Sequence, residues 1–343
     1  MPGRRVIAGT LAALMFVAGC SQSGSPQPVS SSSLAPPPPT TVASSAASST
    51  AQAGAVDPLT GGQVSANPVI AVKIDNTFFE VAQFGVSDAD VVYVEQVEGG
   101  LTRLIAVFHT VLSKEVGPVR SVRSTDSQLL TVYGKPVLVF SGGADGPLGM
   151  LAKTPIINAS GFDAYWRSDV AYGTYNLHAD LQKVAAQAKS LGATAPTDVG
   201  FVFAATDPRV DAGPKATSLK VVMQAGETDF VFSGGHYVRH RNGQPMSDYQ
   251  GRPQVADNVL VQQVTDEPDG TVDTNGQPSM LSHTIGTGAV TLYRDGHAIT
   301  GTWRRPAPDQ PFTYLDAQGQ PLPFKPGHTW VLLAPPKTVV TVG

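Results

Sequence analysis

A long segment without a single charged residue, residues 21–56, restricts where a compact fold can form in this chain. It contains four consecutive serines, Ser30–Ser33, and four consecutive prolines, Pro36–Pro39, followed by repeats of serine and alanine. A segment of this composition buries too little apolar surface to offset the entropy lost on ordering, so the sequence predicts a disordered tether. The folded part is therefore expected from residue 57 onward.

Residues 1–20 have the organisation of an export signal. A short basic start precedes the apolar run Val6–Val17, which is too short for an ordinary membrane span. Two small residues stand directly before Cys20, the single cysteine of the chain, and this arrangement resembles a bacterial lipobox. We expect Cys20 to be the lipidated first residue of a mature protein that is anchored to the cell membrane on its extracytoplasmic side. A plain signal peptide with a chance cysteine is the alternative.

Composition excludes several classes of function. The chain has 23 Lys and Arg against 27 Asp and Glu, a formal net charge of −4, whereas a general nucleic-acid binder carries a basic surface. One cysteine excludes a disulfide framework and a cysteine-based zinc module. We find no nucleotide-binding or nucleophile motif, so the sequence predicts neither a cofactor nor a metal site, and it identifies no protein partner.

Residues 57–210 combine strand and helix patterns. Apolar, β-branched runs predict strands at Val69–Ile74, Val91–Val97, Leu101–Leu112 and Pro136–Phe140, with a turn at Gly99-Gly100. Helical patterns cover Asp126–Tyr133 and Ala179–Leu191, and Phe201–Ala204 is a candidate closing strand. Hairpin spacing mixes with helical crossovers, so we expect an α/β domain, a mixed-sheet layered sandwich with helices on one side.

Residues 211–343 are almost wholly β in pattern. Candidate strands are Leu219–Gln224, Asp229–Phe232, His236–Arg241, Asn258–Val264, Ala289–Arg294, Ala298–Arg304 and Thr329–Ala334. Turn pairs such as Asp269-Gly270 and Asn275-Gly276 separate many of the runs. We expect a second, smaller, mainly β domain, with the boundary between Asp207 and Pro214.

The densest polar cluster of this charge-poor chain lies within residues 88–126. Its charged members that bear on a site are Asp88, Asp90, Glu95, Glu98, Arg103, Arg120, Arg123 and Asp126. Buried charges are costly unless they are paired, so these side chains should meet each other or a ligand. Converging guanidinium groups suit a phosphate, a carboxylate or an acidic sugar. The alternative is an internal lattice of salt bridges.

Paired carboxylates also raise the possibility of glycoside hydrolysis, which needs two acids across the scissile bond. The candidates are Glu98 or Glu95 as the acid and Asp90 or Asp75 as the base or nucleophile. Glu95 and Glu98 differ by three positions and would lie on opposite faces of a regular strand. They form a pair only if the strand ends or bulges at Glu98.

Several motifs carry a family resemblance. They include Lys73-Ile74-Asp75-Asn76, Glu98-Gly99-Gly100, Gly117-Pro118-Val119-Arg120, Gly301-Thr302-Trp303 and the segment Pro326–Trp330. Together they resemble the YerB-like family of bacterial lipoproteins over roughly residues 57–343. The resemblance implies two domains, the first a mixed α/β layered sandwich, on a membrane-anchored lipoprotein, and it supplies no substrate. Tyr175 stands where the family's histidine precedes Asn-Leu.

These observations favour an envelope binding module. We expect Arg103, Arg120 and Arg123, with Asn76 and Asn176 as hydrogen-bonding partners, to hold an anionic or glycan ligand of the cell wall. Two alternatives stay open: an enzyme that hydrolyses or transfers cell-wall polymers with the carboxylates named above, and a lipoprotein that acts as a protein-interaction scaffold.

Overall fold

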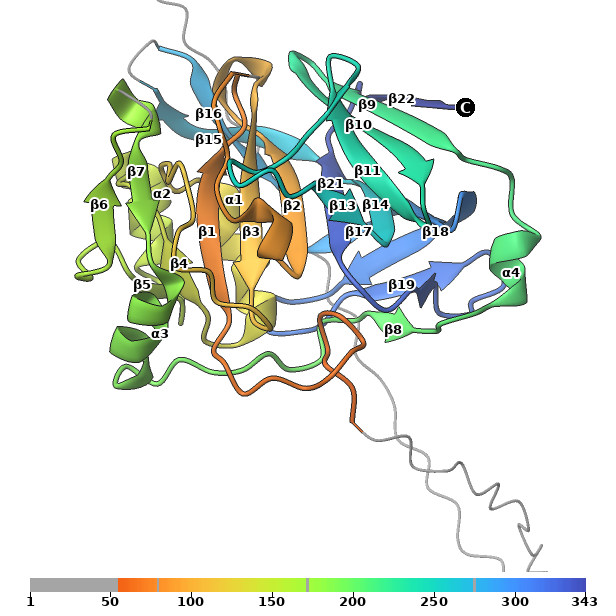
Figure 1. The fold of residues 1–343 in the computed structure, drawn as a ribbon, viewed down its shortest axis with the longest axis horizontal. Helices are drawn as coiled ribbons and strands as arrows, with labels where there is room; N and C mark the ends of the chain where they lie inside the picture. The colour runs from red at the N-terminus through yellow and green to blue at the C-terminus, as the bar shows by residue number, and fades with distance from the viewer. Residues whose placement is uncertain (1–54, 79, 171–172, 274–275) are drawn as a thin grey trace, which may run out of the picture. The chain divides into compact units, whose positions relative to one another are not determined.

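The computed structural model describes residues 55–343, apart from residues 79, 171–172 and 274–275 (Figure 1). The export signal, Cys20 and nearly all of the tether predicted for residues 21–56 lie outside the described residues. Residues 54–343 form one compact unit, and all that follows concerns this unit.

One mixed sheet of ten strands dominates the unit, in the order β19-β18-β17-β14-β21-β2-β3-β1-β4-β5. Its strands in chain order are β1 Ile70–Asp75, β2 Val91–Gln96, β3 Thr102–Phe108, β4 Val137–Val139, β5 Ile157–Asn158, β14 Asn258–Gln263, β17 Gly286–Arg294, β18 His297–Arg305, β19 Thr313–Asp316 and β21 Thr329–Ala334. β3 pairs antiparallel with both β1 and β2, while β21 pairs parallel with both β2 and β14. The mixed sheet expected from the sequence is confirmed, in a fold that is mostly β with few helices.

The sheet runs across the domain boundary that was expected near residue 210. β21 comes from the end of the chain, yet it lies between β14 and β2 in the sheet. Its pairing with β2 matches Val91 to Thr329 and Val94 to Leu332. Backbone hydrogen bonds therefore join the two predicted domains into one continuous sheet, and the boundary itself stays a prediction.

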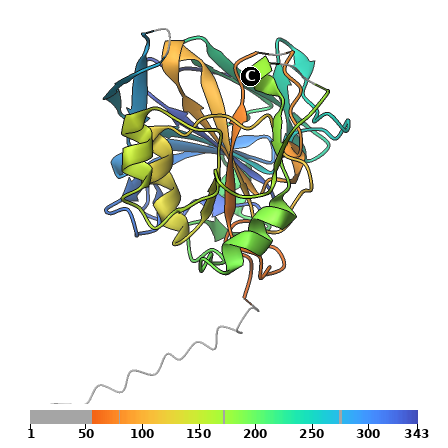
Figure 2. The same cartoon turned by 90° about the vertical axis from the view of Figure 1, so that its left-hand side faces the viewer.

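Helices cover both faces of this sheet. They are α1 Ser124–Leu129, α2 Asp145–Leu151, α3 Leu181–Lys189 and α4 Pro208–Asp211, with short 3-10 turns η1 Val86–Asp88, η2 Glu98–Gly100, η3 Leu130–Tyr133 and η4 Gly173–Tyr175. Val184 of α3 packs in the cluster that contains Val72, whereas Leu129 of α1 packs with Ala71 on the opposite face. Figure 2 shows the yellow helices on one side of the orange strands and the green α3 on the other.

The expectation of helices on one side is therefore wrong. Its physical reason is visible in β1, which is buried along its whole length. A strand that is buried on both faces needs cover on both faces, and the chain supplies helices to each.

A second sheet forms another layer. It has the order β12-β11-β10-β9-β22, with β13 paired to β11, and its strands are β9 Ser218–Met223, β10 Gly226–Ser233, β11 His236–Arg241, β12 Gln244–Pro245, β13 Val255–Ala256 and β22 Val339–Val342. Phe230 of β10 meets Trp330 of β21 edge to face, with ring centroids 5.6 Å apart. Apolar side chains of the two sheets thus share one core.

Three two-stranded sheets complete the fold. They pair β6 Tyr165–Arg167 with β7 Leu177–Ala179, β8 Val202–Phe203 with β20 Pro323–Phe324, and β15 Asp266–Val272 with β16 Pro278–Ser282. The candidate strand Phe201–Ala204 therefore does not close the large sheet. It pairs with β20 because Phe201 packs on Phe324, with ring centroids 4.6 Å apart.

The β15–β16 hairpin packs on α1, although the sequence predicted no strands there. Ser282 N–H donates to Thr125 Oγ1 at 3.0 Å, and Ser124 Oγ donates to Asp269 Oδ2 at 2.6 Å. The hairpin is thereby held against the first turn of α1, which directly follows Arg123.

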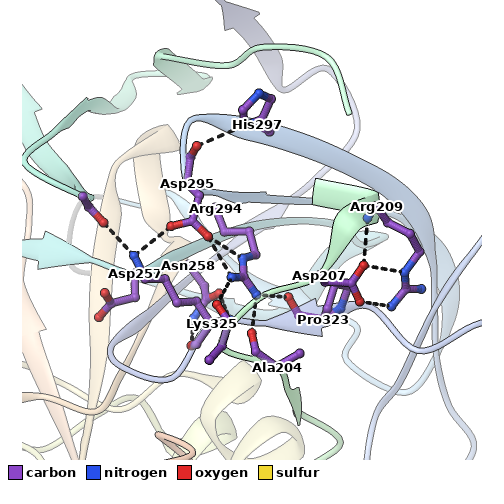
Figure 3. A network of polar contacts seen from close by, with 12 residues as sticks. Ala204, Asp207, Arg209, Asp257, Asn258, Arg294, Asp295, His297, Pro323 and Lys325 are labelled. Atoms are coloured by element: carbon purple, nitrogen blue, oxygen red, sulfur yellow. Dashed lines mark hydrogen bonds and ion pairs between the residues drawn. The ribbon is translucent and has the colours of Figure 1, made fainter. Parts of the chain in front are cut away.

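A buried arginine joins the end of β17 to the segments of the β8–β20 pair (Figure 3). Arg294, at the end of β17, donates to the carbonyls of Ala204, Ala205 and Pro323 at 2.7–3.0 Å. Its Nε and Nη2 donate to Asp295, which also accepts from Lys325. All five donors of this guanidinium are used, so the cost of burying it is offset by hydrogen bonds.

Candidate functional site

A row of charged side chains projects from one face of the large sheet towards α1. Arg103 lies opposite Asp75 of β1 and Glu95 of β2 in the strand register. Lys73 lies on the same face, two residues before Asp75 along β1. The apolar part of this face, which includes Ala71, packs with Leu129 of α1. The charged row therefore lies beneath the start of that helix.

Above the row is a cavity of about 450 Å³, which we call the arginine cavity. Its charged and hydroxyl-bearing lining includes Glu98, Arg103, Arg120, Ser121, Arg123, Asp273 and Ser279. The arginines come from β3 and from the segment before α1, while Asp273 and Ser279 come from the β15–β16 hairpin. The three arginines predicted from the sequence are thus brought together at one cavity.

Arg120 is held from behind by a carboxylate. Its Nε lies 3.0 Å from Asp75 Oδ2, and its guanidinium lies over the Tyr175 ring at 5.2 Å from the centroid. Asp75 Oδ1 accepts hydrogen bonds from the N–H and the hydroxyl of Thr77 at 2.9 and 2.7 Å. These contacts fix the direction of Arg120 at the cavity wall.

Arg123 is held in a similar way by Glu98. Its Nη2 donates to Glu98 Oε2 at 2.5 Å, and its Nη1 donates to the Val122 carbonyl at 2.9 Å. Burial raises the pKa of Glu98, but the hydrogen bond and the charge of Arg123 outweigh burial and hold that pKa below its usual value. Glu98 is therefore an ionised partner of Arg123.

Arg103 differs from both neighbours because no carboxylate is bonded to it. The residue is 7% exposed, and its Nε and Nη1 are buried without a hydrogen-bond partner. Among the residues that the structure describes, no ion pair reaches it either. Burial and the charge of Arg123 lower the pKa of Arg103 to about 10, which leaves it charged at neutral pH. Leaving such donors unsatisfied costs about 1–3 kcal/mol or more.

Beneath the cavity lies a fully buried group of one lysine and two acids. Lys73 Nζ donates to Glu95 Oε1 and, at 2.9 Å, to Asp126 Oδ1. Burial raises the pKa of Glu95 to about 7, although Lys73 opposes this shift. Asp126 Oδ2 accepts the backbone N–H of Arg123 at 2.7 Å. The buried group therefore supports the backbone that carries Arg123.

Only one of the four predicted acids lines the cavity. Asp75 and Glu95 lie behind it in the contacts just described, and Asp90 is buried at the other end of the strand, where it accepts the N–H groups of His109 and Thr110 at 2.6 and 2.9 Å. Of the four predicted acids, Glu98 lines the arginine cavity. Asp273, which the sequence did not single out, also lines it.

The two predicted asparagines do not line the cavity. Asn76 is buried, donates to Thr102 Oγ1 at 2.8 Å and accepts from Arg239 Nη2 at 2.6 Å. Asn176 accepts from Arg167 Nη1 at 2.6 Å. Sequence reasoning missed the β15–β16 wall, although the turn pair Asn275-Gly276 was a signal for the hairpin that forms it.

The described residues contain no group of three or more His, Cys, Asp and Glu side chains that could hold a metal ion. Over those same residues, no helix is both long enough and apolar enough to cross a membrane.

Comparisons with known proteins bear on both halves of the chain. The profile of the protein of unknown function (DUF3048) N-terminal domain matches residues 58–194, and that of the DUF3048 C-terminal domain matches residues 218–331. "Putative lipoprotein YerB" of Bacillus subtilis (strain 168) is 25% identical over 301 residues, which cover 81% of this chain and 86% of that protein. The crystal structure of the YerB protein from Bacillus subtilis has a TM-score of 0.68 at 22% identity, covers 84% of this chain and 100% of its own, and has the same fold.

The arginine cavity is shared between the two matched regions. Arg103, Arg120 and Arg123 fall in the first, and Asp273 and Ser279 fall in the second. The site is therefore complete only when both regions are folded together.

Proposed function

Since the chain belongs to the family that carries the DUF3048 N- and C-terminal domains, whose description names no function, we propose a function from the geometry of the site. The protein binds an anionic group of a cell-envelope glycan or polymer. The ligand's phosphate or carboxylate oxygens enter the arginine cavity. Arg103 is the principal donor, and Arg120 and Arg123 line the same cavity and add their positive charge to it.

The observation that carries this proposal is the unsatisfied guanidinium of Arg103. Arg103 lines the cavity, and two of its donors, Nε and Nη1, are buried without a protein acceptor. An oxyanion in the cavity beside Arg103 would compensate its buried charge. The internal salt-bridge lattice, the alternative considered for these residues, accounts for Arg120 and Arg123 but leaves Arg103 unexplained.

The contacts of Glu98 support binding rather than hydrolysis. A glycosidase needs a general acid whose pKa is raised, and Arg123 instead keeps the pKa of Glu98 low. The other three predicted acids do not line the cavity. The arrangement thus supplies donors for an anion, while Glu98 lacks the raised pKa that a general acid requires.

The place of action follows from the start of the chain. The lipobox-like residues before Cys20 and the lipoprotein named among the relatives support a lipid anchor. With residues 21–56 as a tether, the binding unit would face the extracytoplasmic side of the membrane, within reach of wall polymers.

A co-sedimentation experiment tests the proposal. The full chain and two variants are incubated with purified cell-wall sacculi, and the pelleted protein is measured. We expect Arg103→Ala to lose most of the binding and Arg304→Ala, which removes an exposed arginine outside the cavity, to retain it. Equal pelleting of Arg103→Ala and the unmodified chain would overturn the proposal.

Soluble fragments provide a second readout in the same experiment. Mass spectrometry of the supernatant would detect wall fragments if the protein cut its ligand. Release that is abolished by Glu98→Gln would replace the binding proposal with a hydrolase.

A further inference from the structure

The buried group beneath the cavity is not explained by anion binding alone. Lys73, Glu95 and Asp126 are fully buried, and two carboxylates share one ammonium group. Burying two acids with a single cation is costly, and apolar side chains would fill the same volume without that cost. This group lies directly behind the arginines, so its charge acts on whatever the cavity holds.

The charges of the groups that line the cavity or form the ion pairs directly behind it can be summed. The cations are Lys73, Arg103, Arg120 and Arg123, and the carboxylates are Asp75, Glu95, Glu98, Asp126 and Asp273. Four cations and five carboxylates leave a net charge of −1 when every group is ionised. An anion entering this environment would bring the total to −2 or below, which the partly buried site tolerates poorly.

We infer that the anion enters the arginine cavity together with one proton, which Glu95 accepts. This inference rests on the proposed function and specifies how the same site is regulated. Glu95 Oε1 accepts from Lys73, while Glu95 Oε2 has no hydrogen-bond partner and is the atom to which the proton adds. The proton comes from solvent and neutralises the carboxylate, so the net charge of the site changes less on binding.

The surroundings of Glu95 make it the acceptor. The charged groups that face it are Lys73 on β1, Arg103 on β3, Asp126 in α1 and Arg123 before α1. β16, which also packs near the end of β2, contributes no ionisable side chain. Asp126 accepts both a lysine and a backbone N–H, whereas only one oxygen of Glu95 is bonded.

The direction of the coupling follows from the electrostatics. Burial raises the pKa of Glu95 to about 7, and the charges of Lys73 and Arg123 keep it from rising further. A bound anion cancels part of the arginine field, so the pKa of Glu95 rises on binding. Affinity is then highest below about pH 7 and falls above it, by at most about tenfold per pH unit for one linked proton.

Calorimetric titration of the full chain with sulfate tests this linkage. Sulfate is the probe because its charge does not change near neutral pH, unlike that of phosphate. Titrations in buffers of different ionisation enthalpy count the protons taken up without any substitution. We expect little proton uptake on sulfate binding near pH 6. Near pH 8 we expect an uptake approaching about one proton, which is the full linkage for one titrating group. Sulfate binding without proton uptake at either pH would overturn the inference.

Two variants locate the proton. In Glu95→Gln the affinity for sulfate should stay the same from about pH 6 to about pH 8, close to the value of the unmodified chain at low pH. The matched control Glu267→Gln removes an exposed carboxylate of β15 and should keep the pH dependence. The same slope in Glu95→Gln and the unmodified chain would overturn the inference.

The two proposals fail in different ways. If sulfate binds, depends on Arg103 and shows no linked proton, the inference fails while anion binding stands. If the unmodified chain and Arg103→Ala both fail to bind sulfate and sacculi at every pH, the proposed function fails and this inference falls with it.

Discussion

Two buried arginines of this protein show how differently the same side chain can be used. Arg294 is 1% exposed and directs all five of its donors to three carbonyls and one carboxylate (Figure 3). Arg103 is nearly as buried, yet its Nε and Nη1 have no acceptor. Burial of an arginine therefore does not identify a site, whereas buried donors without acceptors in a residue that lines a cavity indicate one.

The surroundings explain the difference. The carbonyls of Ala204, Ala205 and Pro323 converge on Arg294 because β8 and β20 run parallel beside it. Around Arg103 the available carboxylates are already bound to Arg120, Arg123 and Lys73. The first arrangement is closed and stabilising, while the second leaves one cation directed at a cavity.

The largest expected effect is the loss of stability when Arg294 is replaced. Replacing Arg294 by Met leaves three buried carbonyls without donors and Asp295 with one cation fewer. We expect Arg294→Met to lower the free energy of unfolding by about 3–5 kcal/mol, as measured by urea denaturation. Arg304→Met, on an exposed part of β18, should change it by less than about 0.5 kcal/mol. An equally small effect of Arg294→Met would break the comparison.

The next effect concerns the pH dependence of stability. Burial raises the pKa of Glu95 from 4.5 to about 7 in the folded protein, so the folded state holds this proton more tightly than the unfolded chain does. The stability that this group contributes is fully present below about pH 4.5 and is lost as the pH rises to about 7, by on the order of 2–3 kcal/mol. Glu95→Gln should lack that loss in urea unfolding at about pH 5 and about pH 8. A parallel pH profile for both proteins would contradict this.

A smaller effect on stability is expected at Arg103, with a large effect on binding. Because its donors have no protein acceptors, Arg103→Met should change the free energy of unfolding by no more than about 1 kcal/mol, or raise it. The same variant should abolish binding to sacculi. A loss of several kcal/mol would mean that Arg103 has structural partners comparable to those of Arg294.

The smallest effect is expected at Arg209, which forms ion pairs with Asp207 and Asp316 near the Arg294 network (Figure 3). Its side chain is partly exposed, so solvent screens these pairs. Arg209→Ala should cost less than about 1 kcal/mol by urea denaturation. A cost similar to that of Arg294→Met would show that the number of ion pairs, rather than burial with full hydrogen bonding, sets the stability.

Much of the central sheet could be predicted from the sequence because its strands are continuous apolar runs. β1, β2 and β3 fall within two or three residues of the expected ends, apart from the longer candidate for β3. The helical segments Asp126–Tyr133 and Ala179–Leu191 were also found, as α1 with η3 and as α3. Which face of the sheet each helix covers could not be predicted, since an apolar run does not say which helix packs on which face. The β15–β16 hairpin was missed because its first strand is largely exposed and carries no apolar alternation.

The arginines of the site could also be predicted, because charge is dense around them in a charge-poor chain. Their partners could not. Asn76 bonds to Arg239, which is far away in the sequence, and Asp273 reaches the cavity from the second half of the chain. Contacts of this kind depend on how β21 joins the two halves of the sheet, and local patterns carry no information about that pairing.

The central claim is that Arg103 is an anion-binding group with no structural partner. The most direct test is to titrate the unmodified chain and Arg103→Met with sulfate near pH 6, at constant ionic strength, and to follow binding by calorimetry. The account predicts saturable binding by the unmodified chain and none by Arg103→Met, with both proteins folded. Equal binding by the two proteins would contradict it.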